Sequence, residues 1–530
     1  MKIISILLIS LLFLPTMVRA QKNEIVAYFP EWCSKGEHPY YVKDIEKRNS
    51  ADKITVLNYA FLVPEPDSAG NIIPVLSDPE TAYQQVYSSE MSVDGIADDS
   101  TQMLRGHFNQ LKKLKQKHPD LKILLSIGGW SGSVYFSDAV RTRKSREYFI
   151  NNCIERFISG NLPLLNGAGG EGAAAGIFDG FDIDWEYPVN GGIDSLHHHP
   201  DDNNNLSAFL ALFRAKLDSI GPGYILTAAV PATEKYSRYY NIYNDQQYLD
   251  WYNLMTYDYH GEWNKSTGHF SNLLSSEADT TFDRERYSFD KTVHLYNCIY
   301  GVSRSKLVPG ISFYGKMWKN VDSLNYGLGI PGSSDQEDSS ISYNNFSDLK
   351  KMLNNGFKMH WDNQSMAPYL YNAEDRIFIT FDNVKSVALK SHYVEAYNLR
   401  GLMFWDITGD DSFGALVNTI YTGDMPDITV QPGNDIASTP DIRIIKPLST
   451  DWINEGTNVI LQTEISENRE KIVKVKFFGD GKSLGYCTEP PFNWIWFNIS
   501  EGKHKVEAIG YDNDGSRGES IPVEITVREK

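Results

Sequence analysis

Cysteine is scarce in this chain, which carries four among 530 residues. The four, Cys33, Cys153, Cys298 and Cys487, lie far apart and form no closely spaced pair. Disulfide-stapled small folds and structural zinc modules both need clustered cysteines, so these two classes of protein are excluded. The sequence leaves two interpretations of the cysteines open, which are buried free thiols or one incidental bridge.

Positive charge is also in deficit. The chain has 50 Lys and Arg against 68 Asp and Glu, for a formal net charge of -18. Nucleic acids and anionic membrane surfaces are bound by clustered Lys and Arg, so we expect neither as a partner.

Long apolar runs are missing except at the start of the chain, where residues 3–14 are apolar. That run is too short for a comfortable membrane span. Lys2 precedes it, and Val18 and Ala20 are small residues placed as before a cleavage site. The pattern predicts an export signal over residues 1–20. We expect a secreted monomer without a membrane anchor, either extracellular or periplasmic.

After residue 22, short β-rich runs alternate with amphipathic helical stretches. The helical stretches include 103–117, 143–158, 205–220, 289–303 and 384–398. The eight candidate strands are 25–30, 54–61, 121–127, 177–187, 224–230, 251–257, 307–314 and 402–406. Eight strand-then-helix units predict an α/β fold of the (β/α)8 TIM-barrel class over residues 21–422.

Two stretches do not fit a minimal barrel. Residues 167–176 are rich in Gly and Ala and predict a loop before the fourth strand. Residues 317–380, between the seventh strand and its helix, mix a polar stretch with helical and β-like patterns. We interpret them as a small α+β insertion on the carboxyl-terminal rim of the barrel.

The end of the chain has a different pattern. Residues 423–440 are rich in Pro, Gly and Asp and predict a linker. Asp480-Gly481 and Asp514-Gly515 are typical hairpin turns. Alternating apolar and polar residues predict strands at 442–445, 458–465, 472–478, 493–497, 503–511 and 523–527. The pattern indicates a small all-β, immunoglobulin-like (Ig-like) sandwich over residues 441–530.

The strongest chemical signal is the run DGFDIDWEYP, which begins at Asp179. Side chains alternate between the two faces of a strand, so Asp182, Asp184 and Glu186 share one face, the barrel interior. The other face is apolar, which argues against an acidic surface strand. Asp179 has the opposite parity and is expected to be structural.

Three carboxylates in one column cannot all ionise cheaply, because like charges raise the pKa of at least one. A glutamic acid that keeps its proton near neutral pH is a general acid. Glu186 is the candidate for that role.

The run resembles the DxxDxDxE signature of glycoside hydrolase family 18, and DIDWEYP is similar to its chitinase branch. Four further motifs resemble the family in the same order, at the third, sixth, seventh and eighth predicted strands. They are SIGGW at 126–130, MTYDYHGEW at 255–263, FYG at 313–315 and MFWDITGD at 403–410. The resemblance covers about residues 23–422. It departs at Lys316, where relatives with the insertion often carry arginine, so a bidentate contact there is not expected.

The resemblance implies substrate-assisted catalysis, in which the carbonyl oxygen of the sugar's 2-acetamido group attacks C1. Glu186 would protonate the leaving oxygen and then deprotonate water. Asp184 would hold the acetamide and stabilise the oxazolinium ion, Asp182 would tune Asp184, and Tyr257 would donate a hydrogen bond to the acetamide. The resemblance implies neither a metal nor a cofactor.

The resemblance also implies a set of substrate-binding residues, each of which has ordinary packing or a surface role as its alternative. Trp405 would form the floor of the subsite that holds the sugar at the cleaved bond, by stacking on its pyranose ring. The other residues would line the cleft. These others are Trp130, Trp263, Met255, Asp258, Tyr28 and Tyr314. The insertion is similar to that of relatives with deep, tunnel-like clefts, which favours exo action or sliding along the polymer. The histidines at 197–199 lack ligand spacing, so a metal site is not expected there.

The sandwich resembles Ig-like modules appended to bacterial secreted glycosidases, which suggests a spacer or a weak polysaccharide-binding element. We expect Trp494 and Trp496 in its core, with Trp452 as the outside candidate for a sugar platform. Three functions stay open. The first is a chitinase acting on N-acetylglucosamine polymers, the second an endo-β-N-acetylglucosaminidase acting on N-glycan cores, and the third a lectin without activity. The intact Glu186 argues against the lectin.

Overall fold

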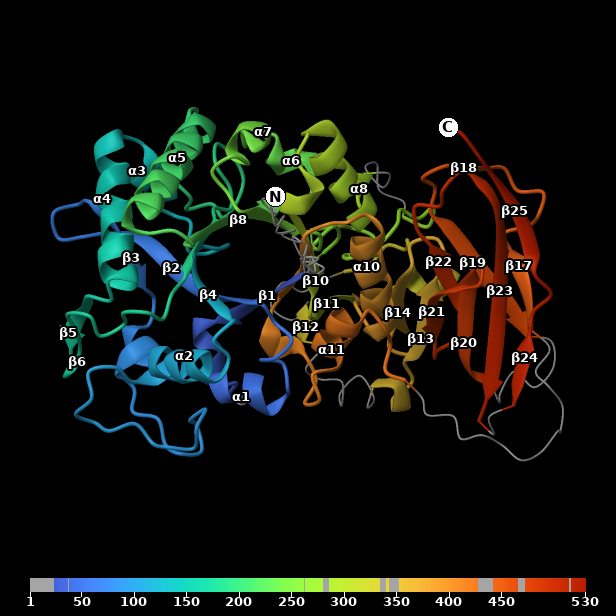
Figure 1. Cartoon of the computed structure of the whole chain (residues 1–530), viewed down its shortest axis with the longest axis horizontal. Helices are drawn as coiled ribbons and strands as arrows, with labels where there is room; N and C mark the ends of the chain where they lie inside the picture. Colours follow the sequence, from blue (N-terminus) through green and yellow to red (C-terminus); the bar gives the residue numbers. More distant parts are fainter. Residues whose placement is uncertain are drawn as a thin grey trace, which may run out of the picture.

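The computed structural model describes residues 23–36, 38–261, 263–279, 286–333, 340–342, 352–427, 442–465, 472–513 and 516–530. The predicted signal at 1–20, most of the predicted linker and the turn at Asp514-Gly515 lie outside these residues. Figure 1 shows a barrel with helices around it and, beside it, a β-sandwich drawn in red. No helix in the described ranges has the length and apolar character needed to cross a membrane.

Eight parallel strands form a closed barrel, as the sequence predicts. Each pairs with the next along the chain, and β1 pairs with both β2 and β16, which closes the ring. The strands are almost wholly buried, as parallel strands covered on both faces must be. They are β1 (Glu24–Pro30), β2 (Val56–Pro66), β4 (Lys122–Gly128), β7 (Gly180–Asp184), β8 (Ile225–Pro231), β9 (Trp251–Met255), β10 (Leu307–Ser312) and β16 (Gly401–Trp405).

Helices surround this barrel, and the five helical stretches predicted from the sequence are all present. They are α1 (Val42–Lys47), α2 (Gly106–Lys117), α3 (Phe136–Val140), α4 (Arg143–Cys153), α5 (Asp202–Ile220), α6 (Glu234–Ser237), α7 (Ile242–Asp245), α8 (Phe289–His294), α10 (Val384–Ala396) and α11 (Ala415–Thr422). Short helical turns are η1 (Glu31–Ser34), η2 (Glu80–Gln84), η3 (Ile154–Ile158), η5 (Leu295–Ile299), η6 (Arg304–Lys306), η7 (Leu324–Gly327) and η9 (Ile407–Gly409).

One expectation for the barrel was wrong. The residues predicted as a loop at 167–176 begin with a strand, because β5 (Leu162–Leu165) and β6 (Ala168–Gly170) form an antiparallel hairpin. The turn is Asn166-Gly167, where both residues have positive φ, at 52° and 75°. Asn-Gly is the preferred pair for such a turn, so the signal was present in the sequence. A second hairpin adds β3 (Ile72–Leu76) to β2.

The predicted insertion lies between β10 and α10. It is a five-stranded antiparallel sheet in the order β12-β11-β15-β14-β13. Its strands are β11 (Tyr314–Trp318), β12 (Ser340–Ser342), β13 (Lys358–Asp362), β14 (Ala367–Asn372) and β15 (Ile377–Phe381). The sheet begins at Tyr314, three residues before the predicted start, because the chain continues from β10 into β11 after one residue.

The carboxyl-terminal part is a sandwich of two sheets, as predicted. One sheet has β17 (Ile442–Lys446), β19 (Val459–Ile465) and β22 (Asn493–Trp496). The other has β18 (Ile453–Asn454), β20 (Ile472–Gly479), β21 (Lys482–Cys487), β23 (Gly502–Asp512), β24 (Arg517–Glu519) and β25 (Val523–Arg528). The short strands β18 and β24 and the hairpin partner β21 were not predicted. Trp494 is fully buried between the sheets, whereas Trp496 is half-buried.

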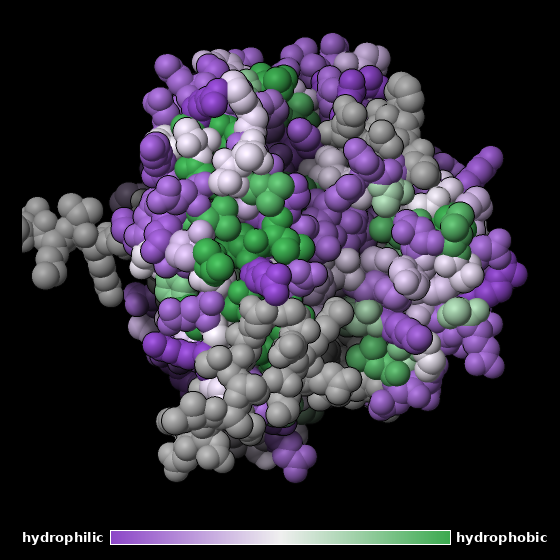
Figure 2. All heavy atoms as spheres, turned by 90° about the vertical axis from the view of Figure 1, so that its right-hand side faces the viewer, coloured by the Kyte–Doolittle hydropathy of each residue, from purple (hydrophilic) through white to green (hydrophobic). Residues whose placement is uncertain are grey.

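The sandwich packs against helix α10 through aromatic rings. His392 and Trp494 meet edge to face at 5.3 Å, and Tyr393 and Phe497 at 5.5 Å. Figure 2, which faces the sandwich end, shows mostly hydrophilic residues with a patch of apolar residues near the middle of that face. The rings that contact α10, those of Trp494 and Phe497, are both buried.

Polar contacts join the sandwich to α10 and to the insertion. Lys385 at the start of α10 donates a 2.6 Å hydrogen bond to the carbonyl of Pro491, and its ammonium lies 4.1 Å from the ring centroid of Trp361 in β13. The side chain of Asn493 in β22 donates to Asn363 of the insertion. Lys385 thus touches the sandwich and the insertion at once.

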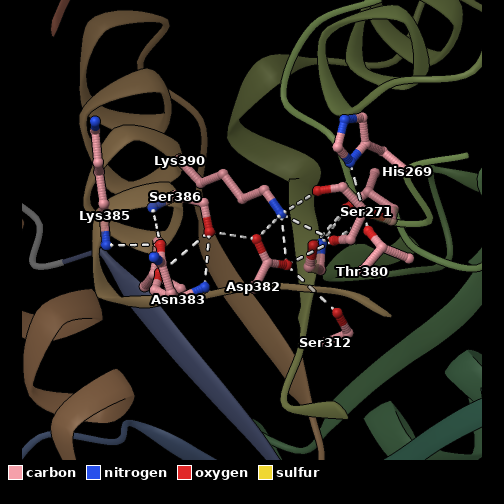
Figure 3. Close-up of polar contacts among 12 residues, drawn as sticks. His269, Ser271, Ser312, Thr380, Asp382, Asn383, Lys385, Ser386 and Lys390 are labelled. Carbon is pink, nitrogen blue, oxygen red and sulfur yellow. Dashed lines mark hydrogen bonds and ion pairs between the residues drawn. The ribbon is translucent and has the colours of Figure 1, made fainter. Parts of the chain in front are cut away.

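A buried ion pair fixes the insertion to the barrel (Figure 3). Lys390 in α10 donates 2.7 Å hydrogen bonds to both carboxylate oxygens of Asp382, which follows β15, and both residues are buried. Asp382 also accepts hydrogen bonds from Ser271, Ser312 and Ser386. These residues come from the loop after β9, the end of β10 and the helix α10, so the pair holds three elements to the insertion.

We predict that Lys390→Met destabilises the fold by about 3–5 kcal/mol, because it leaves a buried carboxylate without its counterion. The double variant Asp382→Asn/Lys390→Met should lose less, since no unpaired charge is left. The control is Arg143→Ala, which breaks the exposed pair with Glu147 and should cost less than about 0.5 kcal/mol. Urea unfolding of the full chain measures all three. A double variant less stable than Lys390→Met would contradict the assignment.

Candidate active site

Three carboxylates lie at the carboxyl end of β7. Asp182 and Asp184 are in the strand and Glu186 is two residues beyond its end. All three are buried, with exposed fractions of 0%, 5% and 9%. Trp185 points to the opposite side, where it stacks on Phe136 at 5.0 Å. The alternation predicted from the sequence is therefore present, and the acids share the interior of the barrel.

Asp182 is held by side chains from four other strands of the barrel, β1, β4, β8 and β9. One of its carboxylate oxygens accepts from the hydroxyls of Tyr28 at 2.9 Å and Ser126 at 2.8 Å. The other accepts from the hydroxyl of Thr227 at 2.6 Å and the amide of Asn253 at 3.1 Å. Burial raises the pKa of Asp182, and these four hydrogen bonds oppose that rise. Asp182 is consequently fixed in place at the base of the column.

Asp184 is the least satisfied of the three acids. Among the described residues its Oδ1 atom has no hydrogen-bond partner, although the atom is buried. Burial raises the pKa of Asp184 well above its ordinary value, and the charges of Glu186 and Asp182 raise it further. Asp184 therefore presents an oxygen that a ligand can satisfy, and a carboxyl group that prefers to share a proton.

Glu186 has the pKa of a general acid. Burial raises its pKa to about 7, the charge of Asp258 adds to the rise, and a hydrogen bond from Tyr187 opposes it. Its backbone N–H donates a 3.1 Å hydrogen bond to Ser133, which holds the chain where it leaves the strand. Glu186 can thus exchange a proton near neutral pH.

Tyr257 lies beyond the end of β9, close to the acids. Burial raises the pKa of its hydroxyl well above the ordinary value, with Asp184 as the largest nearby charge. Its hydroxyl lies 3.9 Å from the sulfur of Met403, a weak acceptor, so the group keeps its proton and can donate it to a better one. Met255, half-buried at the end of β9, packs with Tyr257 and Trp405 against the barrel interior.

Trp405 forms the centre of an aromatic group that the sequence analysis found only in part. Its ring stacks on Phe61 at 5.5 Å with an angle of 14°, and it lies 5.6 Å from the ring of Tyr28 and 6.3 Å from that of Trp32. Trp32 is 53% exposed, so this group reaches the surface. Phe61 and Trp32 were not predicted. Each lies near the carboxyl end of a predicted strand, and that end of a barrel is where functional residues occur.

Lys316 lies beside Asp258 and two aromatic rings. Its ammonium lies 4.0 Å from a carboxylate oxygen of Asp258, 5.6 Å from the ring of Trp263 and 5.8 Å from that of Tyr314. A cation over aromatic rings is attracted to their faces. Lysine therefore joins Asp258 to the rim residue Trp263, which is 56% exposed. Trp130, 54% exposed, lies on another part of the rim, 6.5 Å from Tyr187.

Other polar residues singled out in the sequence lie outside this site. Asp179 accepts a 2.8 Å hydrogen bond from the backbone of Ile123 and pairs with Lys115, so it joins strands, as expected. His197 pairs with Asp138. Throughout the described part of the chain, no group of three or more His, Cys, Asp or Glu side chains is arranged to hold a metal ion.

The cysteines and Trp452 were also singled out in the sequence. All four cysteines are unpaired, and Cys298 alone among them is exposed. Trp452 is 72% exposed, but the guanidinium of Arg528 lies 3.7 Å from its ring centroid and covers one face. Trp452 therefore offers a sugar only its other face.

Comparison with known proteins places these features in a family. Residues 24–410 match the model of glycosyl hydrolases family 18, and residues 440–508 match the bacterial Ig domain. Chitinase A1 of Niallia circulans is 31% identical over 439 residues, covering 74% of this chain and 58% of that protein. The chain likewise spans 58% of chitinase C from Streptomyces lividans, so it corresponds to little more than half of these relatives.

Solved structures show the same similarity. The catalytic domain of psychrophilic chitinase B from Arthrobacter TAD20 superposes with a TM-score of 0.69 at 30% identity, covering 76% of this chain and 95% of that one. The Group IV chitinase of Ostrinia furnacalis, in complex with allosamidin, gives a TM-score of 0.62 at 28% identity and covers 76% of this chain and 98% of that one.

We predict that Asp258→Asn lowers the pKa of Glu186 below its value of about 7, because it removes a negative charge that disfavours the ionised glutamate. Carbon-13 NMR of the labelled glutamate carboxyl groups measures the shift, with Glu186→Gln assigning the signal. Asp138→Asn, on the outer side of the barrel near His197, is the control and should leave the signal in place. An unchanged titration in Asp258→Asn would show that the two groups are not coupled.

Proposed function

The chain belongs to glycosyl hydrolases family 18, and from that membership and the acidic column we propose that it is a chitinase. It would cleave β-1,4 links between N-acetylglucosamine units. The observation that carries the proposal is the state of the three acids, since Glu186 titrates near neutral pH beside an Asp184 whose buried oxygen has no partner among the described residues. The relatives named above are themselves chitinases.

The proposed mechanism uses the substrate's own acetamide as the nucleophile. Its carbonyl oxygen bonds to C1 as the glycosidic C–O bond breaks, and Glu186 gives its proton to the leaving oxygen. An oxazolinium ion results, and its N–H would bond the oxygen of Asp184 that has no partner in the described ranges. Glu186, now ionised, takes a proton from water as the water attacks C1. The bond from C1 to the acetamide oxygen breaks in this step, which regenerates the acetamide and returns the anomeric configuration to that of the substrate.

The neighbours of the acids fit the same steps. Tyr257 keeps its proton because its pKa is raised, so it can donate a hydrogen bond to the acetamide oxygen. Asp182 is fixed by four donors and places its charge below Asp184, which favours a shared proton between them. Trp405 would carry the pyranose on the face that Phe61 leaves free.

We propose cleft-lining roles for the remaining rim residues. Trp130 and Trp263 are exposed enough to stack on sugar rings. Tyr28 bonds Asp182, and the charge of Asp258 raises the pKa of Glu186. Met255 and Tyr314 pack beside Tyr257. The insertion would wall one side of the cleft, which favours chitin over a branched N-glycan. Parallel assays on chitin oligomers and on a high-mannose glycoprotein separate a chitinase from an endo-β-N-acetylglucosaminidase.

We also propose a division of labour along the chain. Residues 1–20 would direct export and be removed, and the mature protein would act as a monomer outside the cytoplasm. The catalytic barrel would comprise residues 21–422, with the linker at 423–440 and the sandwich at 441–530. The contacts of Lys385 and Asn493 support a bracing role for the sandwich, because they join it to the insertion that walls the cleft.

Glu186→Gln should lower kcat on chitin tetramer by roughly 10²–10⁴-fold while leaving binding intact, because it removes the proton donor and keeps the shape. Asp184→Ala should also lower kcat, by loss of support for the positive charge of the intermediate. Steady-state kinetics and calorimetric titration give the two readouts. Near wild-type kcat in Glu186→Gln would refute the assignment, and a change in KM alone would refute the role of Asp184.

The bracing role predicts that truncation after residue 427 lowers the Tm of the catalytic barrel, since it uncovers the rings of His392 and Tyr393. Lys385→Met should give a smaller decrease, because it breaks one link and keeps the aromatic contact. Calorimetry measures both, with Lys503→Met, at an exposed lysine of β23 in the sandwich, as the matched control. An unchanged Tm in the truncated chain would show that the sandwich is only tethered.

A further inference from the structure

A column of stacked rings crosses the insertion and ends at the surface. Phe378 is fully buried, and Tyr369 stacks on it at 5.2 Å. His360 stacks on Tyr369 at 5.1 Å, and Tyr326 stacks on His360 at 4.4 Å. Tyr326 is 59% exposed, so the column runs from the core of the insertion to solvent. A buried stack that ends on an open aromatic face is a rigid platform.

The open end of the column lines a groove of about 540 Å³. That volume lies within the range of ligand sites in proteins, about 300–1,000 Å³. Residues whose side chains can form hydrogen bonds line the groove. They include Glu277, Asn325, Asp362, Asn363 and Gln364. No residue that lines it belongs to the acidic column or the aromatic group around Trp405, so the groove is separate from the catalytic cleft.

The backbone around Tyr326 is held in an unfavourable conformation. Asn325 and Tyr326 both have φ of 50°, in the left-handed region that residues with a side chain rarely adopt. Two hydrogen bonds keep the turn closed, from Asn325 to the carbonyl of Leu328 and from the backbone of Tyr326 to Ser323. The turn directs a large aromatic side chain outward, at a cost of roughly 1–3 kcal/mol for each residue.

The turn is also joined to the rim of the catalytic cleft. Trp263 begins a segment whose next residues pair with the loop that carries Tyr326, since Gly332 donates to the carbonyl of Lys265 at 3.0 Å and Thr267 donates to that of Ile330 at 2.9 Å. The hydroxyl of Thr267 bonds the carbonyl of Gly327, next to Tyr326. The exposed rings of Trp263 and Tyr326 therefore lie on two segments that are hydrogen-bonded to one another.

We propose that this groove is a second carbohydrate-binding site, which holds N-acetylglucosamine units of a chitin chain outside the cleft with one pyranose ring on the face of Tyr326. The inference rests on the proposed function for the identity of the sugar. The carboxylates of Glu277 and Asp362 disfavour an anionic ligand. The single exposed ring with its polar border suits a neutral ligand that is apolar on one face and hydroxylated at its edges.

The first test measures binding without turnover, in the Glu186→Gln full chain. Tyr326→Ala in that background should weaken retention on insoluble chitin by roughly 3–10-fold, from the loss of one stacking contact. Tyr326→Trp should retain binding, because it keeps an aromatic face. The matched control is Tyr243→Ala in α7, which removes another tyrosine that is 66% exposed and should change nothing. Thermal denaturation verifies that each variant is folded.

The second test uses active enzyme. Tyr326→Ala should retain kcat/KM on the soluble tetramer, which the cleft alone can hold, and should lose several-fold in the rate on insoluble chitin. Wild-type retention and wild-type turnover on insoluble chitin in Tyr326→Ala would overturn the second site and leave the proposed function standing. Failure of the unmutated chain to cleave the tetramer would overturn the proposed function, and the retention measurement would still decide the groove.

Discussion

The burial of three carboxylates at the carboxyl end of β7 is the constraint on which the rest of the structure depends. The interior of a closed barrel cannot solvate three carboxylates, so each must be satisfied by protein groups or shift its pKa. Asp182 is satisfied by four donors from four strands, which places a requirement on the sequence of each of those strands. Burial raises the pKa of all three acids, and Asp184 and Glu186, which lack such a set of donors, hold protons more tightly than ordinary acids. The proposed chemistry depends on both effects of burial. Glu186 resists ionisation and can therefore donate a proton. The oxygen of Asp184 that has no partner among the described residues can accept a hydrogen bond from the substrate's N–H.

The same barrel end is supported by structure that the sequence places far away. The insertion supplies Lys316 and Tyr314 to the wall, and it is held by the ion pair of Asp382 with Lys390. The sandwich then covers α10 and reaches the insertion through Lys385. An Ig-like module that looks like a detachable spacer in the sequence is therefore packed against α10 and bonded to the insertion. This arrangement also holds the outer groove, one border of which is bonded to the sandwich.

The barrel and the acid column could be predicted because each rests on a local period. Alternation along β7 placed Asp182 and Asp184 on one face and Asp179 on the other, and the structure has that arrangement. The partners of these residues could not be predicted, because Phe61 and Trp32 approach Trp405 only after the barrel closes. The two-residue strand β18, which pairs with the distant β25, and the contact of the sandwich with α10 were missed for the same reason, since pairing between distant segments leaves no period in either one. The three-residue strand β24 pairs with the adjacent β23 and is too short to show a period. The hairpin at residues 162–170 was missed for a different reason. The sequence contains the Asn166-Gly167 turn signal, but the glycine-rich composition of residues 167–176 led to the prediction of a loop.

The central claim is that the buried acids let the sugar's own amide act as the nucleophile. It is tested most directly by comparing hydrolysis of two chitin oligomers of equal length, one fully acetylated and one with a free amine on the sugar that occupies the cleaved position. The account predicts rapid cleavage of the first, with products that keep the β configuration, and no measurable cleavage of the second at that bond. Efficient cleavage of the deacetylated link would contradict it, because a nucleophile other than the acetamide would then have to exist.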